Sequence, residues 1–433
     1  MHYQNKRALA GTVRSWVKVR DRLVGHENSF LFLNADSVLR MVYEMVCESL
    51  RQLFRYDFAL DFSFPTMNLH SKFAAVAVAL LSSAALAADE PKLLNIYNWS
   101  DYIAEDTIKN FEKETGIKVR YDLFDSNEVL HAKLAAGKTG YDIVVPSSNW
   151  ARLQIDGGLL RELDKSKIPN LANLDPQLQS LIAAKLDPGN KHLVIWLWGF
   201  TTLGINVDKV KATLGGMPMP DNAWDLLFDP KYSSKLKSCG ISVLDSPSEI
   251  MPAALIYLGK PAYSKNASDY QDAGRLLQSV RSNITLFSSS GYINDLANGS
   301  LCLSLGWSGD INIARQRAID AKNGNKIEAL VPKTSATLLF DTMAIPTDAP
   351  HPNNAHLWIN YITRPEVHAG LTNKVFYANP NAAALKFVRK DLAENKTIYL
   401  SDEDKKRMTV PEPYSSDIRR VMTRVYTKFK TGL

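Results

Sequence analysis

The sequence has little of what metal, redox or hydrolytic sites need. Cysteine occurs only three times in 433 residues, at Cys47, Cys239 and Cys302, with no CxxC pair and no Cys/His cluster. The histidines are scattered, and neither a GxSxG nor an HExxH motif is present. We therefore expect no metal site, no cofactor and no enzyme activity.

A long apolar run is also missing. The longest candidate, residues 73–88, has 16 residues, many of them alanine, whereas a spanning helix needs roughly 20. It follows Met67 and contains the small-x-small site 85–87, so residues 67–87 are interpreted as a cleaved signal peptide. No cysteine follows it that could carry a lipid. The pattern predicts a soluble periplasmic protein.

The segment before Met67 is harder to interpret. Residues 1–66 show no clean strand or helix period, although 39–53 could form an amphipathic helix. One reading is a cytoplasmic or membrane-associated arm. We favour the other, a misassigned N-terminal extension translated from a start codon upstream of the natural one.

A strong charge of one sign is absent as well. Residues 1–87 hold ten of the 51 basic and seven of the 45 acidic residues, which leaves 41 against 38 and a net charge near +3. So mild a balance argues against nucleic-acid binding. The remaining length suits two domains. Its two cysteines, Cys239 and Cys302, are expected to pair in an oxidising compartment.

What the sequence does contain is a close alternation of strand and helix patterns. Residues 93–97 form a short apolar run, 105–115 show helical spacing before Gly116, and 117–124 alternate like a strand. A helix at 127–136 and a buried strand at 141–145 continue the series. Later segments read as strands at 193–197, 202–206, 300–305, 327–331 and 343–345, and as helices at 224–228, 248–258, 270–281, 311–321, 352–362, 365–372 and 415–430. Repeated β-α-β units predict open, mostly parallel sheets flanked by helices.

Aromatic and acidic side chains recur where these strands end. Residues 99–102, 146–150, 307–310 and 339–341 follow or end strand-like runs, and three of the four join an aromatic ring to a carboxylate. Ligands of open α/β sheets bind beyond such strand ends. A ring face and a carboxylate together suit an organic cation. Each residue alone also fits a structural role, the tryptophans in a core and the aspartates as helix caps.

Five blocks of sequence resemble the periplasmic polyamine-binding proteins, and among them the putrescine receptors of ABC importers. The blocks are NIYNWSDYI (95–103), NFEKETGIKV (110–119), YDIVVPS (141–147), YINDLANG (292–299) and VFYAN (375–379). The resemblance covers residues 91–433 and implies the two-lobed type II periplasmic-binding-protein fold, with a cleft between the lobes. We expect lobe 1 at 91–200 and 325–375, and lobe 2 at 201–324 and 376–433.

The resemblance also implies a ligand-binding site. Its aromatic walls would be Trp99, Tyr102, Trp307 and Tyr377, and its carboxylates Asp101, Glu249, Asp310 and Asp341, with polar contacts from Ser100 and Ser147. Leu339 departs from the pattern, which has an aromatic ring there, and Trp150 stands near a position that helps set ligand length. The family's disulfide falls on Cys239 and Cys302.

The sequence thus predicts a monomeric periplasmic receptor for putrescine or a related polyamine that delivers its ligand to ABC permease subunits. Ser246 lies where an acid would favour a third amine, so a diamine is preferred. The alternatives are a spermidine-preferring receptor and a polyamine sensor for a membrane signalling partner. Affinity and the preference among putrescine, cadaverine and spermidine stay open.

Overall fold

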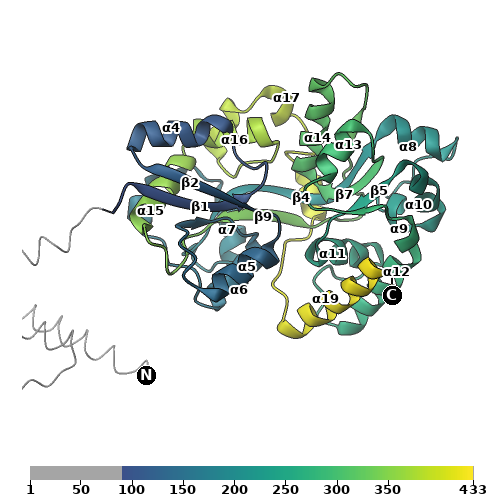
Figure 1. The fold of residues 1–433 in the computed structure, drawn as a ribbon, viewed down its shortest axis with the longest axis horizontal. Coiled ribbons are helices and arrows are strands. Elements are labelled where there is room, and N and C mark those ends of the chain that lie inside the picture. Colours follow the sequence, from purple (N-terminus) through teal and green to yellow (C-terminus); the bar gives the residue numbers. More distant parts are fainter. Residues whose placement is uncertain (1–89, 433) are drawn as a thin grey trace, which may run out of the picture. The chain divides into compact units, whose positions relative to one another are not determined.

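The computed structural model describes residues 90–432, so the predicted extension (1–66) and signal peptide (67–87) lie outside the described residues. Two sheets organise this part of the chain, a three-stranded sheet in the order β2-β1-β3 and a six-stranded one in the order β6-β5-β7-β4-β8, with β9 also paired to β4 (Figure 1). The strands are β1 Leu93–Trp99, β2 Lys118–Phe124, β3 Ile143–Val144, β4 Val194–Asn206, β5 Ile241–Val243, β6 Leu286–Phe287, β7 Leu303–Trp307, β8 Ile327–Ala329 and β9 Leu338–Met343.

Helices surround both sheets (Figure 1). The α-helices are α4 Glu105–Thr115, α5 Asn127–Ala136, α6 Ser148–Asp156, α7 Pro176–Lys185, α8 Val207–Leu214, α9 Asp225–Phe228, α10 Pro230–Leu236, α11 Pro247–Tyr257, α12 Ala267–Val280, α13 Tyr292–Asn298, α14 Ser308–Asp320, α15 Pro352–Ile362, α16 Pro365–Val375, α17 Lys390–Ala393, α18 Asp402–Arg407 and α19 Ser416–Thr431. Short 3-10 helices lie at η2 Lys165–Lys167, η3 Pro169–Asn173, η4 Lys237–Cys239, η5 Arg281–Asn283 and η6 Ala382–Phe387.

The first sheet is parallel and follows directly from the first β-α-β units. Strand β1 pairs with β2 from Leu93–Lys118 to Trp99–Phe124. Helix α4 connects them and ends at Gly116, whose φ of 71° is the left-handed conformation that favours glycine at a helix end. Helix α5 then begins at Ser126, whose side chain accepts a hydrogen bond from the Val129 amide. The elements predicted for 93–136 are confirmed.

Strand β4 differs from the sequence prediction, which had two short strands, 193–197 and 202–206. It is a single strand of 13 buried residues that runs antiparallel to β7, β8 and β9. Its first half pairs with β9 and its second half with β7 and β8. The six-stranded sheet is therefore mixed, with parallel pairs only at β5–β6 and β5–β7. Because all residues of β4 are buried, its sequence lacks the alternation of polar and apolar residues that would identify it as one continuous strand.

Strand β4 contributes side chains to two hydrophobic cores. Phe200 and Leu203 belong to the largest core, together with α11, α12 and α19. Trp196 and Leu197 belong to a second core with β1, α15 and α16. Strand β4 therefore links the two cores, as does β9, which places Phe340 in the first and Leu339 in the second.

The end of β9 is close to β3. Isolated bridges join Val144 to Ala344 and Ser147 to Asp341. The structure places the strand at Leu338–Met343, earlier than the predicted 343–345. This shift puts Asp341 inside a strand that faces the end of β3, and not in a loop before a strand.

Some helices match the sequence prediction and others were missed. Helix α15 has the predicted bounds, whereas α6, α7, α8 and α13 were not predicted. In α7 only Ile182 is buried, and Leu178 and Leu181 are partly buried against the largest core. Within residues 90–432, none of the helices combines the length and the apolar character that crossing a bilayer requires.

The predicted disulfide is confirmed. Cys239 and Cys302 are bonded with their Cα atoms 5.5 Å apart and 63 residues apart in sequence, tying η4 to the start of β7. On the chain-entropy model a loop of this size adds about 4 kcal/mol to stability.

We therefore expect the double variant Cys239→Ser, Cys302→Ser to have a free energy of unfolding lower by about 2–4 kcal/mol in denaturant titration. Dithiothreitol should destabilise the unchanged protein by a similar amount and leave the variant unaffected. An unchanged unfolding midpoint in the variant would show that the bond contributes nothing to stability.

Candidate functional site

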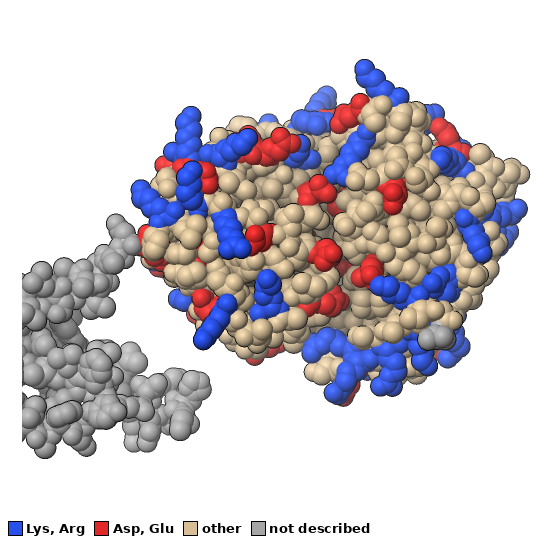
Figure 2. Space-filling view, viewed as in Figure 1, with Lys and Arg blue, Asp and Glu red and all other residues tan. Residues whose placement is uncertain are grey.

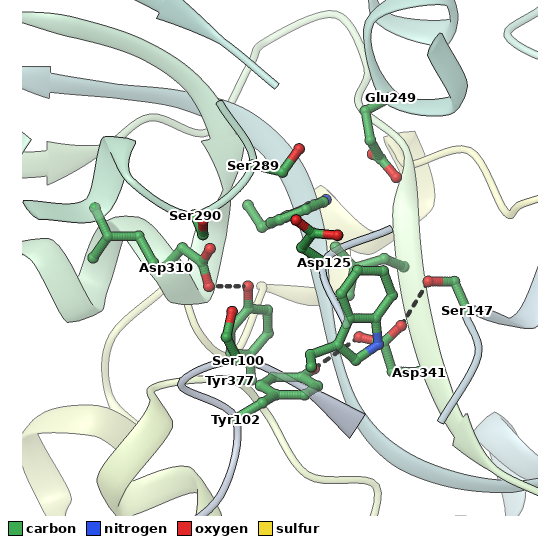
Figure 3. A pocket seen from close by; sticks show the side chains of 14 residues that line it. Ser100, Tyr102, Asp125, Ser147, Glu249, Ser289, Ser290, Asp310, Asp341 and Tyr377 are labelled. Carbon is green, nitrogen blue, oxygen red and sulfur yellow. Dashed lines mark hydrogen bonds between the residues drawn. The ribbon is translucent and has the colours of Figure 1, made fainter. Parts of the chain in front are cut away.

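A pocket opens where the ends of the strands from both sheets meet (Figure 3). Trp99 ends β1, Ser147 follows β3, and Trp307 ends β7. The side chains that line it are those of Trp99, Ser100, Tyr102, Asp125, Ser147, Glu249, Ser289, Ser290, Ile293, Trp307, Asp310, Leu339, Asp341 and Tyr377. The set is dominated by aromatic rings, carboxylates and hydroxyls.

Asp310 lies in the first turn of α14 and accepts two phenolic hydrogen bonds. The Tyr377 and Tyr292 hydroxyls donate to its two oxygens at 2.7 and 2.9 Å. Burial raises the pKa of Asp310 to about 6, although both hydrogen bonds favour the ionised form. This carboxylate is thus held in place by neutral donors and takes no counter-charge from them.

Two glycines make room for these tyrosines. A Cβ atom at Gly309 would lie 2.1 Å from the Tyr377 ring, and one at Gly306 would lie 2.5 Å from the Tyr292 ring. Either contact is far below van der Waals distance, and the obstructing atoms are rigid rings. The spacing of glycines around Trp307 therefore lets both rings reach Asp310.

Asp341 is held in the same manner on the other side of the pocket (Figure 3). Its oxygens accept from the Tyr102 hydroxyl at 2.9 Å and the Ser147 hydroxyl at 2.7 Å. Burial, with a smaller effect from the charges of Glu249 and Asp310, raises its pKa to about 7, although both hydrogen bonds favour the ionised form. Near neutral pH the Asp341 carboxyl group is therefore partly protonated.

Glu249 is the third carboxylate of the pocket. It lies in the first turn of α11, and its Oε2 accepts from the Thr201 hydroxyl at 2.5 Å. Burial raises its pKa, and the charge of Glu128 raises it further. In the described part of the chain, no Lys or Arg forms a salt bridge with Glu249, Asp310 or Asp341.

Aromatic rings line the space between these acids. Tyr102 and Tyr377 meet edge to face with centroids 4.8 Å apart, and Trp99 and Trp307 do so at 6.0 Å. The Trp99 indole is fixed by a 2.8 Å hydrogen bond to the Val145 carbonyl. Such walls suit an apolar stem, while the ring faces attract positive charge.

The pocket brings together ten of the twelve side chains predicted for the site. The other two, Asp101 and Trp150, do not line it. The Asp101 carboxylate pairs with Arg317 of α14 at 3.0 Å. Trp150 packs in α6 against the His131 ring, with centroids 5.5 Å apart. Leu339, the departure from the family pattern, does line the pocket and is 8% exposed.

Sequence reasoning missed four lining residues. They are Asp125, Ser289, Ser290 and Ile293. Asp125 follows β2 directly, so the rule that ligands bind beyond strand ends could have found it. Ser289 and Ser290 follow β6, a strand of two residues that no sequence pattern marks. Ile293 lies inside a family block quoted above, but its apolar side chain gave no chemical signal.

The chemistry of the pocket is that of cation binding. The described residues include no group of three or more His, Cys, Asp or Glu side chains that could hold a metal ion, and aromatic rings line the pocket beside Glu249, Asp310 and Asp341. Figure 2 shows acidic side chains gathered near the hollow in the middle of one face, with Lys and Arg mostly around the periphery. A compact organic cation fits this arrangement better than an anion or a neutral solute.

Comparison with known proteins decides the family. Residues 106–397 match the model for "Bacterial extracellular solute-binding protein". The chain belongs to the bacterial extracellular solute-binding proteins. The expectation that it is not an enzyme is confirmed, because this family binds solutes.

Relatives of this solute-binding protein confirm the resemblance seen in its sequence. It is 48% identical over 359 residues to the putrescine-binding periplasmic protein PotF of Escherichia coli, which covers 82% of this chain and 96% of the relative. It is 46% identical over 352 residues to the putrescine-binding periplasmic protein SpuD of Pseudomonas aeruginosa, covering 81% and 95%. The solved structure of a spermidine/putrescine ABC transporter protein from Listeria monocytogenes matches with a TM-score of 0.70 and 30% identity, over 78% of this chain and 99% of that one. The predicted fold class is confirmed.

We expect the ionised Asp341 side chain to lower the stability of the ligand-free protein. A carboxyl group with a pKa of about 7 when folded and about 4 when unfolded is destabilising above pH 7, and the penalty fades as the pH falls towards 4. We expect Asp341→Asn to raise the melting temperature of the ligand-free protein by a few degrees at pH 8, with a smaller gain at pH 5.

Thermal unfolding followed by circular dichroism measures both values. Asp156→Asn, an exposed change on α6, serves as the matched control and should have little effect. A variant of Asp341 that melts lower than the unchanged protein at pH 8 would contradict the assignment.

Proposed function

We propose that this protein is a periplasmic receptor that binds putrescine and delivers it to an ABC importer. The observation that carries the proposal is the placement of carboxylates without basic partners among the described residues on opposite sides of one aromatic pocket. Asp310 lies on one side, and Asp341 and Glu249 on the other (Figure 3). A diamine presents two ammonium groups joined by an apolar stem, and each part would meet its complement here.

The absence of basic partners supports a cationic ligand. Buried carboxylates are costly unless a cation or hydrogen bonds satisfy them. Asp310 and Asp341 each have two hydroxyl donors but no salt bridge within residues 90–432. Ligand ammonium groups would supply that charge and add charge-assisted hydrogen bonds.

The volume of the pocket favours a short ligand. It measures about 40 Å³, and a single water needs about 10–15 Å³ on this scale. A chain of a few heavy atoms suits that volume better than a triamine does. Leu339 gives the pocket an aliphatic wall in place of the aromatic ring that the family pattern leads us to expect.

We further propose that the ligand is held by closure of two lobes, 91–200 with 325–375 and 201–324 with 376–433. The three-stranded sheet of β1, β2 and β3, which lies in the first lobe, and strands β5, β6 and β7, which lie in the second, support this division. The ion pair between Asp101, after β1, and Arg317 of α14 joins the two lobes beside the pocket and would favour the closed form. A closed receptor would then present one surface to the permease.

The relatives support the location that we propose for this protein. The names of the Escherichia coli and Pseudomonas aeruginosa relatives place those proteins in the periplasm and give putrescine as their ligand. Similarity over about four-fifths of the chain supports the same compartment here. We further propose export by the signal peptide at 67–87 and action as a monomer with ABC permease subunits.

Calorimetric titration of residues 88–433 tests the proposal, after unfolding and refolding to remove carried-over ligand. We expect tight binding of putrescine and weaker binding of spermidine, because the space in the pocket, about 40 Å³, is small. Asp310→Asn should weaken putrescine binding by more than about tenfold, since one ammonium loses its charge partner.

The matched control is Asp320→Asn at the exposed end of the same helix, which should bind like the unchanged protein. Stronger spermidine binding would identify a spermidine-preferring receptor. Absence of heat from both amines would refute the proposed function.

A further inference from the structure

We propose that Glu128 is a further specificity-determining residue, which selects ligands with a cationic nitrogen at the Glu249 side of the pocket. This inference rests on the proposed function and deepens it. Glu128 does not line the pocket and is not part of the set implied by the family resemblance. Its effect would be to favour a diamine over a monoamine of the same length.

Glu128 is fixed relative to the pocket by its neighbours in α5. The preceding residue, Asn127, exchanges two hydrogen bonds with Ser147, donating to its hydroxyl at 3.0 Å and accepting from its amide at 2.9 Å. Ser147 in turn donates to Asp341 at 2.7 Å. The first turn of α5 is thus tied to a carboxylate of the pocket, and Glu128 has little freedom to move away.

The carboxylate of Glu128 faces the helix that carries Glu249. Its Oε1 lies 3.3 Å from the hydroxyl of Ser248, the residue directly before Glu249 in α11. Helix α5 follows a strand of the first sheet, and α11 follows a strand of the second. The contact therefore joins the two proposed lobes and brings the acidic groups together when the pocket is closed.

The charges around this pair are mostly negative. The charge of Asp245 raises the pKa of Glu128, and the charge of Glu128 raises the pKa of Glu249. Asp245 forms a salt bridge with Lys430. Within the described residues, neither Glu128 nor Glu249 has a salt-bridge partner. Arg419 lies near His131, one turn along α5, and forms its hydrogen bonds with the Tyr414 carbonyl and Ser416.

The Glu128 charge acts on Glu249, and neither carboxylate has a basic partner within residues 90–432, so the two repel each other on closure when both are ionised. An ammonium group beside Glu249 removes this repulsion, because it is attracted to both charges. The methyl end of a monoamine does not remove it and also desolvates the acids. Glu128 therefore increases the difference in affinity between a diamine and a monoamine, although it does not line the pocket.

The test compares putrescine with n-butylamine, which has the same carbon chain and one ammonium group. Calorimetry or competition gives both dissociation constants for residues 88–433. We expect Glu128→Gln, which keeps the shape and removes the charge, to reduce the preference for putrescine by about tenfold, and Glu128→Ala to do the same. Ser248→Ala, which leaves the charge, should largely keep the preference.

Glu162→Gln, an exposed change in the same proposed lobe, is the matched control and should leave both constants unchanged. Circular dichroism melting curves check that each variant folds. An unchanged putrescine-to-butylamine ratio in Glu128→Gln and Glu128→Ala, with putrescine still bound tightly, would overturn the role of Glu128 alone. Failure of the unchanged protein to bind putrescine would overturn the proposed function and this inference together.

Discussion

Buried carboxylates that lack protein counter-charges are the constraint on which the rest of this structure depends. Asp310, Asp341 and Glu249 are each held by neutral donors, and burial raises the pKa of all three. Hydroxyl donors orient a carboxylate without satisfying its charge. The fold thus maintains a pocket whose electrostatic energy is lowered by a cation from outside, which is the physical requirement for a receptor of amines.

The scaffold explains how such a pocket is tolerated. Strand β4 is buried along its whole length and belongs to both large cores, so the two sides of the pocket are held by well-packed elements. Gly306 and Gly309 admit the rings of Tyr292 and Tyr377. Extensive apolar burial in the two cores can offset the energetic penalty of a few ionisable groups at their junction.

Much of this could be predicted from the sequence, and the limits have physical causes. The alternating patterns predicted the first β-α-β units, and the family resemblance named ten residues that the structure brings together in one pocket. Periodicity did not reveal β4 as one strand, because every residue of it is buried. The pairing of Asp101 with Arg317 could not be predicted either, because it depends on an element 216 residues away. Glu128 could not be found either, because its relevance comes from the packing of α5 against α11.

The most direct test of the central claim is to count protons released when putrescine binds, by calorimetry at about pH 6.5 in two buffers of different ionisation enthalpy. Ammonium groups favour the ionised carboxylates, so a free-form pKa of about 7 for Asp341 and about 6 for Asp310 predicts release of about one proton per ligand, falling towards zero near pH 8.5. Equal heats in both buffers at pH 6.5 would mean that no proton is released. That result would contradict the assignment of these carboxylates as the partners of the ligand.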